Sequence, residues 1–202
     1  MVERMILEGR GYDVCSYFYV DEDGAGFLFD PGADPDKIMR RMRAGGYSVE
    51  KIIITHGHID HIGALDDIRA LTGAPVLIHE NGKLFLSDPR YNLSAGISTH
   101  ADGYFKDGDL IKTRSGSLCL RVIHTPGHTD DSCVFYSEKD GIAFTGDTIF
   151  KETFGNYMFP TGNYGTLMDS IKNRILTLPA DTVLYSGHTS ETTVGDESGM
   201  YL

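Results

Sequence analysis

The segment 51–63 (KIIITHGHIDHIG) places four metal-ligand side chains, His56, His58, Asp60 and His61, between a β-branched run and a helical pattern. With eight histidines in 202 residues, chance would give this spacing in roughly one such chain in a thousand. Alternate residues of an extended loop point the same way, so His56 and His58 can share one metal. Asp60 and His61 diverge from that pair and suit a second metal. The fold must therefore support a crowded strand–loop–helix connection.

Short apolar segments alternate with helical patterns along the chain, which favours an α/β protein with buried strands. Strands are expected at 26–30, 51–55, 76–79, 110–113, 118–125, 132–137, 142–145 and 182–185, with hairpin turns at 114–117 and 138–141. Helices are expected from Pro35, with Asp34 as the cap, at 62–71, and at 167–178. Residues 81–109 show no clean period, and we predict a long binding loop with at most a short helix.

Composition limits the class of protein. Hydrophobic residues make up 41% and charged residues 23%, as in ordinary globular proteins, and we expect one domain over residues 1–202. The net charge of -11 weighs against nucleic-acid and anionic-membrane partners. No apolar run has a membrane helix's length of about 20 residues, and the opening MVERMILEGR lacks a signal-peptide pattern. Three cysteines without CxxC spacing indicate neither a disulfide framework nor a cysteine zinc site, so a cytoplasmic location is expected.

Three more candidate ligands follow predicted strands later in the chain. His128 lies in HTPGHTDDS, Asp147 follows GIAFTG, and His188 follows TVLYSG. Ligands of α/β proteins gather at the carboxyl ends of strands. The three side chains are therefore expected to converge with the first cluster.

With these motifs the chain resembles the metallo-β-lactamase superfamily, and within it the glyoxalase II-like (hydroxyacylglutathione hydrolase-like) hydrolases. The resemblance covers nearly the whole chain: LFDPG, HxHxDH, TPGHT, GDTIF and SGHT occur in the family's order. It implies an αββα four-layer sandwich, in which two mixed β-sheets face each other with helices outside. A weak internal echo, FLFDPG with IIITHGH and IAFTGD with VLYSGH, also suggests two related sheets.

The resemblance also implies two metal sites. The first metal would be bound by His56, His58 and His128, and the second by Asp60, His61 and His188, with Asp147 bridging both. Asp30 matches an aspartate that supports the HxHxDH loop. Five imidazoles and two carboxylates suit two divalent cations, with zinc favoured and iron or manganese as alternatives.

In such a centre two cations lower the pKa of a shared water to about 7, and the hydroxide attacks a carbonyl. Asp60 would both ligate and orient this hydroxide. The chain has no GxSxG motif, so no serine nucleophile is expected. The leading substrate is an acyl thioester such as S-lactoylglutathione.

Substrate recognition is expected to differ from that of longer relatives. Only residues 189–202 follow the last histidine, so the helical glutathione-binding domain is expected to be absent. Where the family often has Gly-Arg-x-Asp, residues 155–158 read GNYM. Candidate substrate-binding residues are Lys151, Asn156, Tyr157 and Arg90.

Other functions remain open from the sequence. A persulfide dioxygenase would hold one iron with His56, His128 and Asp147. Lactone, β-lactam or phosphodiester hydrolysis and a non-catalytic metal-binding role are further alternatives, whereas the second histidine of HxHxDH disfavours a flavodiiron protein. A small-molecule substrate is expected, and the oligomeric state is left open.

Overall fold

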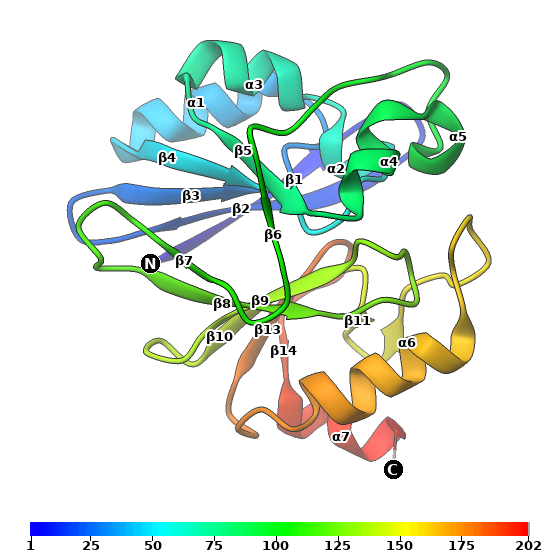
Figure 1. Ribbon diagram of the computed structural model, residues 1–202. Helices are drawn as coiled ribbons and strands as arrows, with labels where there is room; N and C mark the ends of the chain where they lie inside the picture. The colour runs from blue at the N-terminus through cyan, green and yellow to red at the C-terminus, as the bar shows by residue number, and fades with distance from the viewer. Residues whose placement is uncertain (202) are drawn as a thin grey trace.

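Two mixed β-sheets pack face to face at the centre of the computed structural model, which describes residues 1–201 (Figure 1). In spatial order the first sheet contains β1 (Val2–Glu8), β2 (Asp13–Val20), β3 (Ala25–Phe29), β4 (Ser48–Ile53), β5 (Val76–His79) and β6 (Gly103–Phe105). The second contains β14 (Thr192–Thr193), β13 (Val183–Ser186), β10 (Ile142–Gly146), β9 (Cys133–Ser137), β8 (Cys119–His124) and β7 (Leu110–Lys112). Strands β3 to β6 run parallel, as do β10 and β13, and the other pairs are antiparallel.

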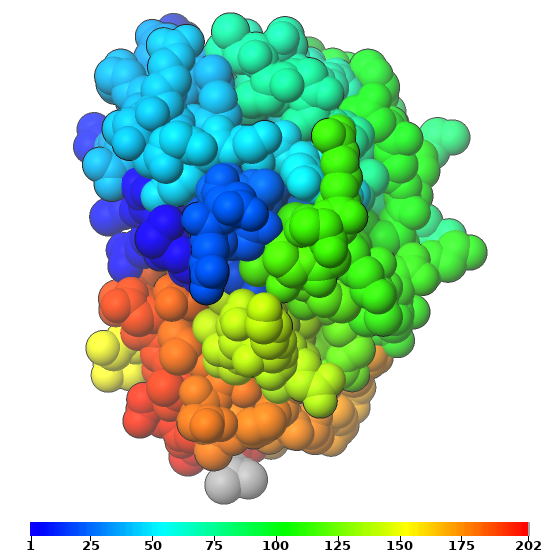
Figure 2. All heavy atoms as spheres, turned by 90° about the vertical axis from the view of Figure 1, so that its left-hand side faces the viewer, coloured from blue at the N-terminus to red at the C-terminus, as the bar shows by residue number. Residues whose placement is uncertain are grey.

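Helices cover the outer face of each sheet. The first sheet carries α1 (Pro35–Gly45) and α3 (Leu65–Thr72), and the second carries α6 (Tyr164–Ser170) and α7 (Val194–Tyr201) (Figure 1). The last turn of α6 continues as a π-helical segment, Ile171–Ile175. Figure 2 shows the amino-terminal half, in blue and cyan, stacked on the carboxyl-terminal half, in orange and red. The predicted αββα sandwich is confirmed.

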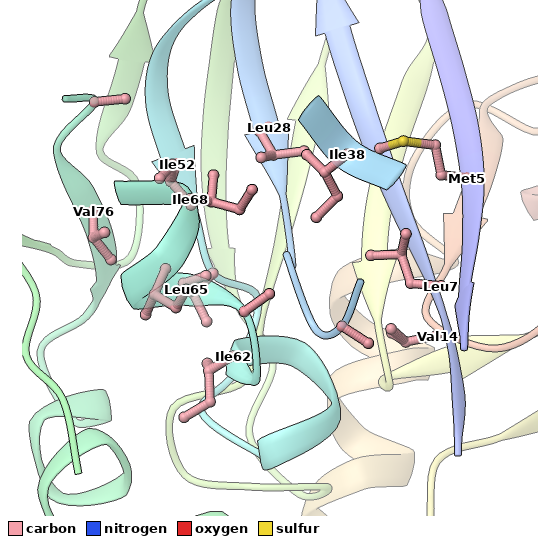
Figure 3. Packing of buried hydrophobic residues seen from close by; sticks show 14 of the residues in the cluster. Met5, Leu7, Val14, Leu28, Ile38, Ile52, Ile62, Leu65, Ile68 and Val76 are labelled. Carbon is pink, nitrogen blue, oxygen red and sulfur yellow. The ribbon is translucent and has the colours of Figure 1, made fainter. Parts of the chain in front are cut away.

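Three clusters of buried apolar side chains fill the spaces between the four layers of helices and sheets. Aliphatic side chains such as Leu28, Ile38 and Ile68 fill the space between the first sheet and its helices (Figure 3). Aromatic rings fill the space between the sheets, where Phe29 stacks on Phe144 at 4.0 Å between ring centroids. The third layer lies between the second sheet and its helices. Each sheet is therefore buried on both faces, which explains the apolar runs of its central strands.

The predicted strands are present, with ends shifted by three residues at most, and both predicted hairpins are antiparallel pairs. Helix α1 also begins as predicted: Asp34 Oδ1 accepts the Lys37 N–H at 2.9 Å, and Pro35 occupies the first turn. Gly46 ends the helix with a φ of 67°.

The prediction of a long loop at 81–109 is wrong. This region contains α4 (Gly82–Ser87), α5 (Pro89–Asn92) and β6, which pairs in parallel with β5. A buried amide ties the region together, since Asn92 Nδ2 donates to the carbonyl oxygens of Phe85 and Ile97. Elements of three to six residues are too short to show a hydrophobic period, which explains the error.

The expected helix at 62–71 is instead divided into α2 (Ile59–Ile62) and α3. The chain turns at Gly63, whose missing Cβ would lie 2.2 Å from the Gly32 carbonyl oxygen. Strands β1, β2, β6 and β14, the small β11 (Ile149–Phe150) and β12 (Thr153–Phe154) ribbon, and α7 had not been predicted. Across residues 1–201, no helix combines the length and apolar character needed to cross a membrane.

Candidate metal centre

Strand ends from both sheets bring seven histidines and aspartates together. His56 and His58 follow β4, Asp147 follows β10, and His188 follows β13. Asp60 and His61 lie on α2, and His128 lies in the turn between β8 and β9. Their ligand atoms form two groups: His56, His58 and His128 in the first, and Asp60, His61, Asp147 and His188 in the second. The structure therefore brings together all seven side chains that the resemblance assigns to metal binding.

The first group is a triangle of buried imidazole nitrogens. His58 Nδ1 lies 3.1 Å from His56 Nε2 and 3.0 Å from His128 Nε2, and the latter two atoms are 3.1 Å apart. Nitrogens on a tetrahedral zinc ion lie about 3.3 Å apart. Burial lowers the pKa of His58 to about 3 and also lowers the pKa values of the other two imidazoles. Three unprotonated nitrogens at this spacing fit a divalent cation.

The second group combines carboxylates with imidazoles. His188 Nε2 lies 3.2 Å from both Asp60 Oδ2 and Asp147 Oδ2, and His61 Nε2 lies 3.3 Å from Asp147 Oδ1. Burial opposes protonation of His188, but the hydrogen bonds that its ring N–H donates to Asp147 and Asp60 raise its pKa to about 10. Among the described residues, His61 Nε2 and Asp147 Oδ1 are buried without a hydrogen-bond partner. Orphaned buried polar atoms are costly, and a cation would satisfy both.

Asp147 lies between the two groups. Its Oδ2 atom is 3.2 Å from His188 Nε2 and 3.7 Å from His128 Nε2, so one carboxylate reaches ligands of both groups. Gly187 allows this position, because a Cβ there would lie 2.2 Å from Asp147 Oδ1.

In three of the five histidines the other ring nitrogen makes a hydrogen bond of 2.9 Å or less that orients the imidazole. His61 Nδ1 donates to Asp30 Oδ2 at 2.9 Å, and His128 Nδ1 donates to the Asn156 carbonyl oxygen at 2.6 Å. His188 Nδ1 donates to the Asp13 carbonyl oxygen at 2.7 Å. Because Nδ1 keeps its proton, Nε2 is the ring nitrogen left to bind a metal, and a bound cation would displace the second proton of His188.

Asp30 links this centre to the end of β4. Its Oδ1 accepts the Thr55 N–H at 2.8 Å, and its Oδ2 accepts the Thr55 hydroxyl at 2.7 Å as well as the His61 ring N–H. Asp30 has a backbone φ of 47°, which is strained for a residue other than glycine. Three hydrogen bonds to one buried carboxylate keep it there.

The candidate substrate-binding residues occupy varied positions. Arg90 is exposed and pairs with Asp88, and Lys151 is exposed. Asn156 reaches His128 through its backbone, while Tyr157 packs against the ring of Phe154.

Sequence reasoning missed several features of the centre. The ring of Phe159 stands edge-on to His58, with centroids 5.4 Å apart, and is 37% exposed. Asp131 is fully buried beside the first group, and burial raises its pKa to about 7. The Asp13 and Asn156 carbonyls leave no mark in a sequence, whereas Asp131 was visible in HTDDS.

A groove of about 600 Å³ lies beside α2. It is lined by Arg10, Tyr12, Ile59, Gly63 and residues 93–97. Ile59, one of the lining residues, is the chain neighbour of His58 and Asp60, although none of the seven ligand-type side chains lines the groove itself. One wall, residues 93–97, lies within the region 81–109 for which the sequence had predicted a long binding loop.

Residues 10–188 match the family sequence model of the metallo-beta-lactamase superfamily. The chain belongs to this superfamily. It is 34% identical over 184 residues to the probable metallo-hydrolase YqgX of Bacillus subtilis, covering 89% of this chain and 86% of the relative. It is 32% identical over 190 residues to the hydroxyacylglutathione hydrolase GloC of Haemophilus influenzae, covering 91% and 88%.

The fold of this superfamily member also matches solved structures. The crystal structure of BLEG-1 B3 metallo-beta-lactamase superposes with a TM-score of 0.92 at 31% identity, over 98% of this chain and 97% of that one. Superfamily membership, together with the His/Asp clusters, supports a metal-binding enzyme of the hydrolase type.

Proposed function

We propose that this superfamily member is a hydrolase that uses two divalent cations, zinc being favoured, to cleave acyl thioesters such as S-lactoylglutathione. The observation that carries the proposal is the pair of adjacent ligand groups that share Asp147. The similarity to GloC over 91% of the chain supports the thioester class.

The donor set indicates what each residue does. Bound divalent cations would supply Lewis acidity and activate water for attack on the carbonyl. Asp60, whose side chain is 20% exposed, lies on the accessible side of the second group and can orient water and accept its proton. His188, at 28% side-chain exposure, lies beside it. The histidines of the first group are buried and hold fixed positions.

The surroundings offer complementary contacts to a thioester. We assign the groove of Arg10, Ile59 and residues 93–97 to one arm of the substrate, since it joins an exposed cation to apolar side chains. Phe159 offers an exposed apolar face beside the first group. Lys151, Asn156, Tyr157 and Arg90 remain proposed substrate contacts.

A single-iron persulfide dioxygenase would use His56, His128 and Asp147, but His58 Nδ1 completes the same triangle at 3.0–3.1 Å. The second group is also complete, which favours two metals. The likeness to BLEG-1 makes β-lactam hydrolysis the second candidate function.

The test is a substrate panel on protein of known metal content: S-lactoylglutathione, other thioesters, a lactone, a cephalosporin, a phosphodiester and glutathione persulfide. We expect the highest kcat/KM with a thioester. Asp60→Ala should lower kcat by about 100-fold or more, whereas Asp67→Ala, a change at an exposed carboxylate on α3, should not. Fast turnover of another class, or full thioester activity in Asp60→Ala, would refute the proposal.

A further inference from the structure

We propose that Asp131 is a positioning residue for the first ligand group, because its carboxylate holds the backbone between two of the three histidines. The inference rests on the proposed metal-binding function and adds a residue that the ligand motifs do not include. Asp131 does not contact the ligand nitrogens themselves.

The contact is a single buried hydrogen bond. The N–H of Gly57 donates to Asp131 Oδ2 at 2.9 Å, and both residues are buried. Gly57 is the residue between His56 and His58, so its peptide orientation sets the direction of both side chains. Because the two rings must aim different nitrogens, Nε2 and Nδ1, at one point, a small peptide rotation would separate them.

The same carboxylate joins the two chain segments that supply the group. His128 lies three residues before Asp131, and the short turn between them is held by Thr129, whose N–H and hydroxyl contact Ser132 Oγ at 3.2 and 2.6 Å. A second bond, from the Cys133 N–H to the Thr55 carbonyl oxygen at 3.0 Å, fixes the neighbouring backbone. Asp131 therefore couples the position of His128 to that of His56 and His58.

Tight packing prevents Gly57 from settling elsewhere. A Cβ on Gly57 would lie 2.5 Å from the Phe85 Cβ on α4, and a Cβ on Gly82 would lie 3.0 Å from Asp131 Oδ2. The carboxylate is thus enclosed by α4 on one side and the ligand loop on the other. The second oxygen of Asp131, Oδ1, has no hydrogen-bond partner among residues 1–201. The bond from the Gly57 N–H to Oδ2 is therefore the contact through which the carboxylate acts.

A structural role and a positioning role for Asp131 predict different changes in the metal affinities of the two sites. Loss of a structural contact loosens the domain and weakens both metal sites together. Loss of a positioning contact weakens the first site selectively, because the second group does not include Gly57 or its neighbours. Groups that orient metal ligands typically change metal affinity by about 10- to 100-fold.

The experiment uses the full chain, stripped of metal and titrated with Zn²⁺ against a chromophoric chelator, so that two dissociation constants are obtained. The same titration of Asp60→Ala identifies the constant that belongs to the second group. Asp131→Ala should weaken first-site binding by about 10- to 100-fold and leave the second constant within about threefold. Asp131→Asn should restore the first constant, because its amide oxygen can accept the Gly57 N–H. Asp130→Ala is the matched control, an exposed aspartate one residue away.

Each outcome decides the question. Equal weakening of both sites in Asp131→Ala, or a first-site constant equal to that of Asp130→Ala, would overturn the inference. If Asp131→Ala does not fold, Asp131→Asn carries the test: a first-site loss of tenfold or more in the folded variant shows that the acceptor is not what matters. Absence of zinc binding by the unaltered protein would instead reject the proposed function.

Discussion

Asp30→Asn replaces one oxygen of a buried carboxylate with an NH₂ group and keeps the size of the side chain. The amide oxygen can still accept the Thr55 N–H, but the NH₂ group must face the His61 ring, which now donates from Nδ1. The amide NH₂ group and the ring N–H are both donors, so they cannot hydrogen-bond to each other. The ring can accept from the new amide only by moving its proton to Nε2, the atom that points at the second group.

The expected cost follows from that lost contact. A hydrogen bond to a charged group is worth about 1.5–3 kcal/mol, which corresponds to about a 10- to 150-fold change in affinity. We therefore predict that Asp30→Asn weakens the second metal site by that factor and leaves the first site nearly unchanged. The free energy of unfolding of the metal-free protein should fall by a similar 1.5–3 kcal/mol, since Asp30 is 3% exposed.

Two assays separate these effects. Zinc titration against a competing chelator measures each site, and urea unfolding of metal-free protein measures stability. Asp67→Asn, which alters an exposed aspartate on α3, is the matched control and should change neither quantity. Two unchanged zinc constants in Asp30→Asn would refute the claim that Asp30 sets the proton position on His61.

Two further predictions concern the centre and the seam between the sheets. Gly187→Ala would place a Cβ 2.2 Å from Asp147 Oδ1 and should abolish tight binding of the second metal, whereas Gly199→Ala, with open space around it, should bind zinc normally. The stacked rings of His79 and His124 lie 4.1 Å apart, and burial, followed by the charge of His124, lowers the pKa of His79 from 6.5 to about 4. The unfolded chain therefore takes up this proton first, and stability should fall by about 1–3 kcal/mol between pH 6.5 and 4, after allowance for solvent screening. In His79→Phe, urea midpoints should depend less steeply on pH over this window; an unchanged slope would contradict the assignment.

Local sequence predicted the parts of the fold that depend on neighbouring residues. The Asp34–Pro35 start of α1 and its end at Gly46 follow from capping chemistry that is complete within one turn. Short β-branched runs marked the central strands because those strands are buried on both faces. The seven ligand-type side chains were visible because few other roles place so many imidazoles and carboxylates after strand ends.

Short elements escaped this reasoning. Helices α4 and α5 and strand β6 span three to six residues each, and their order depends on contacts such as those of Asn92. Strand β1 is an edge strand whose partner, β2, lies across a hairpin. Its sequence, VERMILE, mixes charged with apolar residues, so no apolar run marks this strand even though its partner is near in the chain.

Sequence alone determined the set of chemical groups: which imidazoles and carboxylates exist, and which of them follow strands. Only the tertiary structure decided which ring nitrogen faces inward, that Asp147 reaches both groups, and that backbone carbonyls hold His128 and His188. The physical reason is distance along the chain. Gly57 and Asp131 are 74 residues apart, and their hydrogen bond exists because two sheets pack together, a relation that no local pattern records.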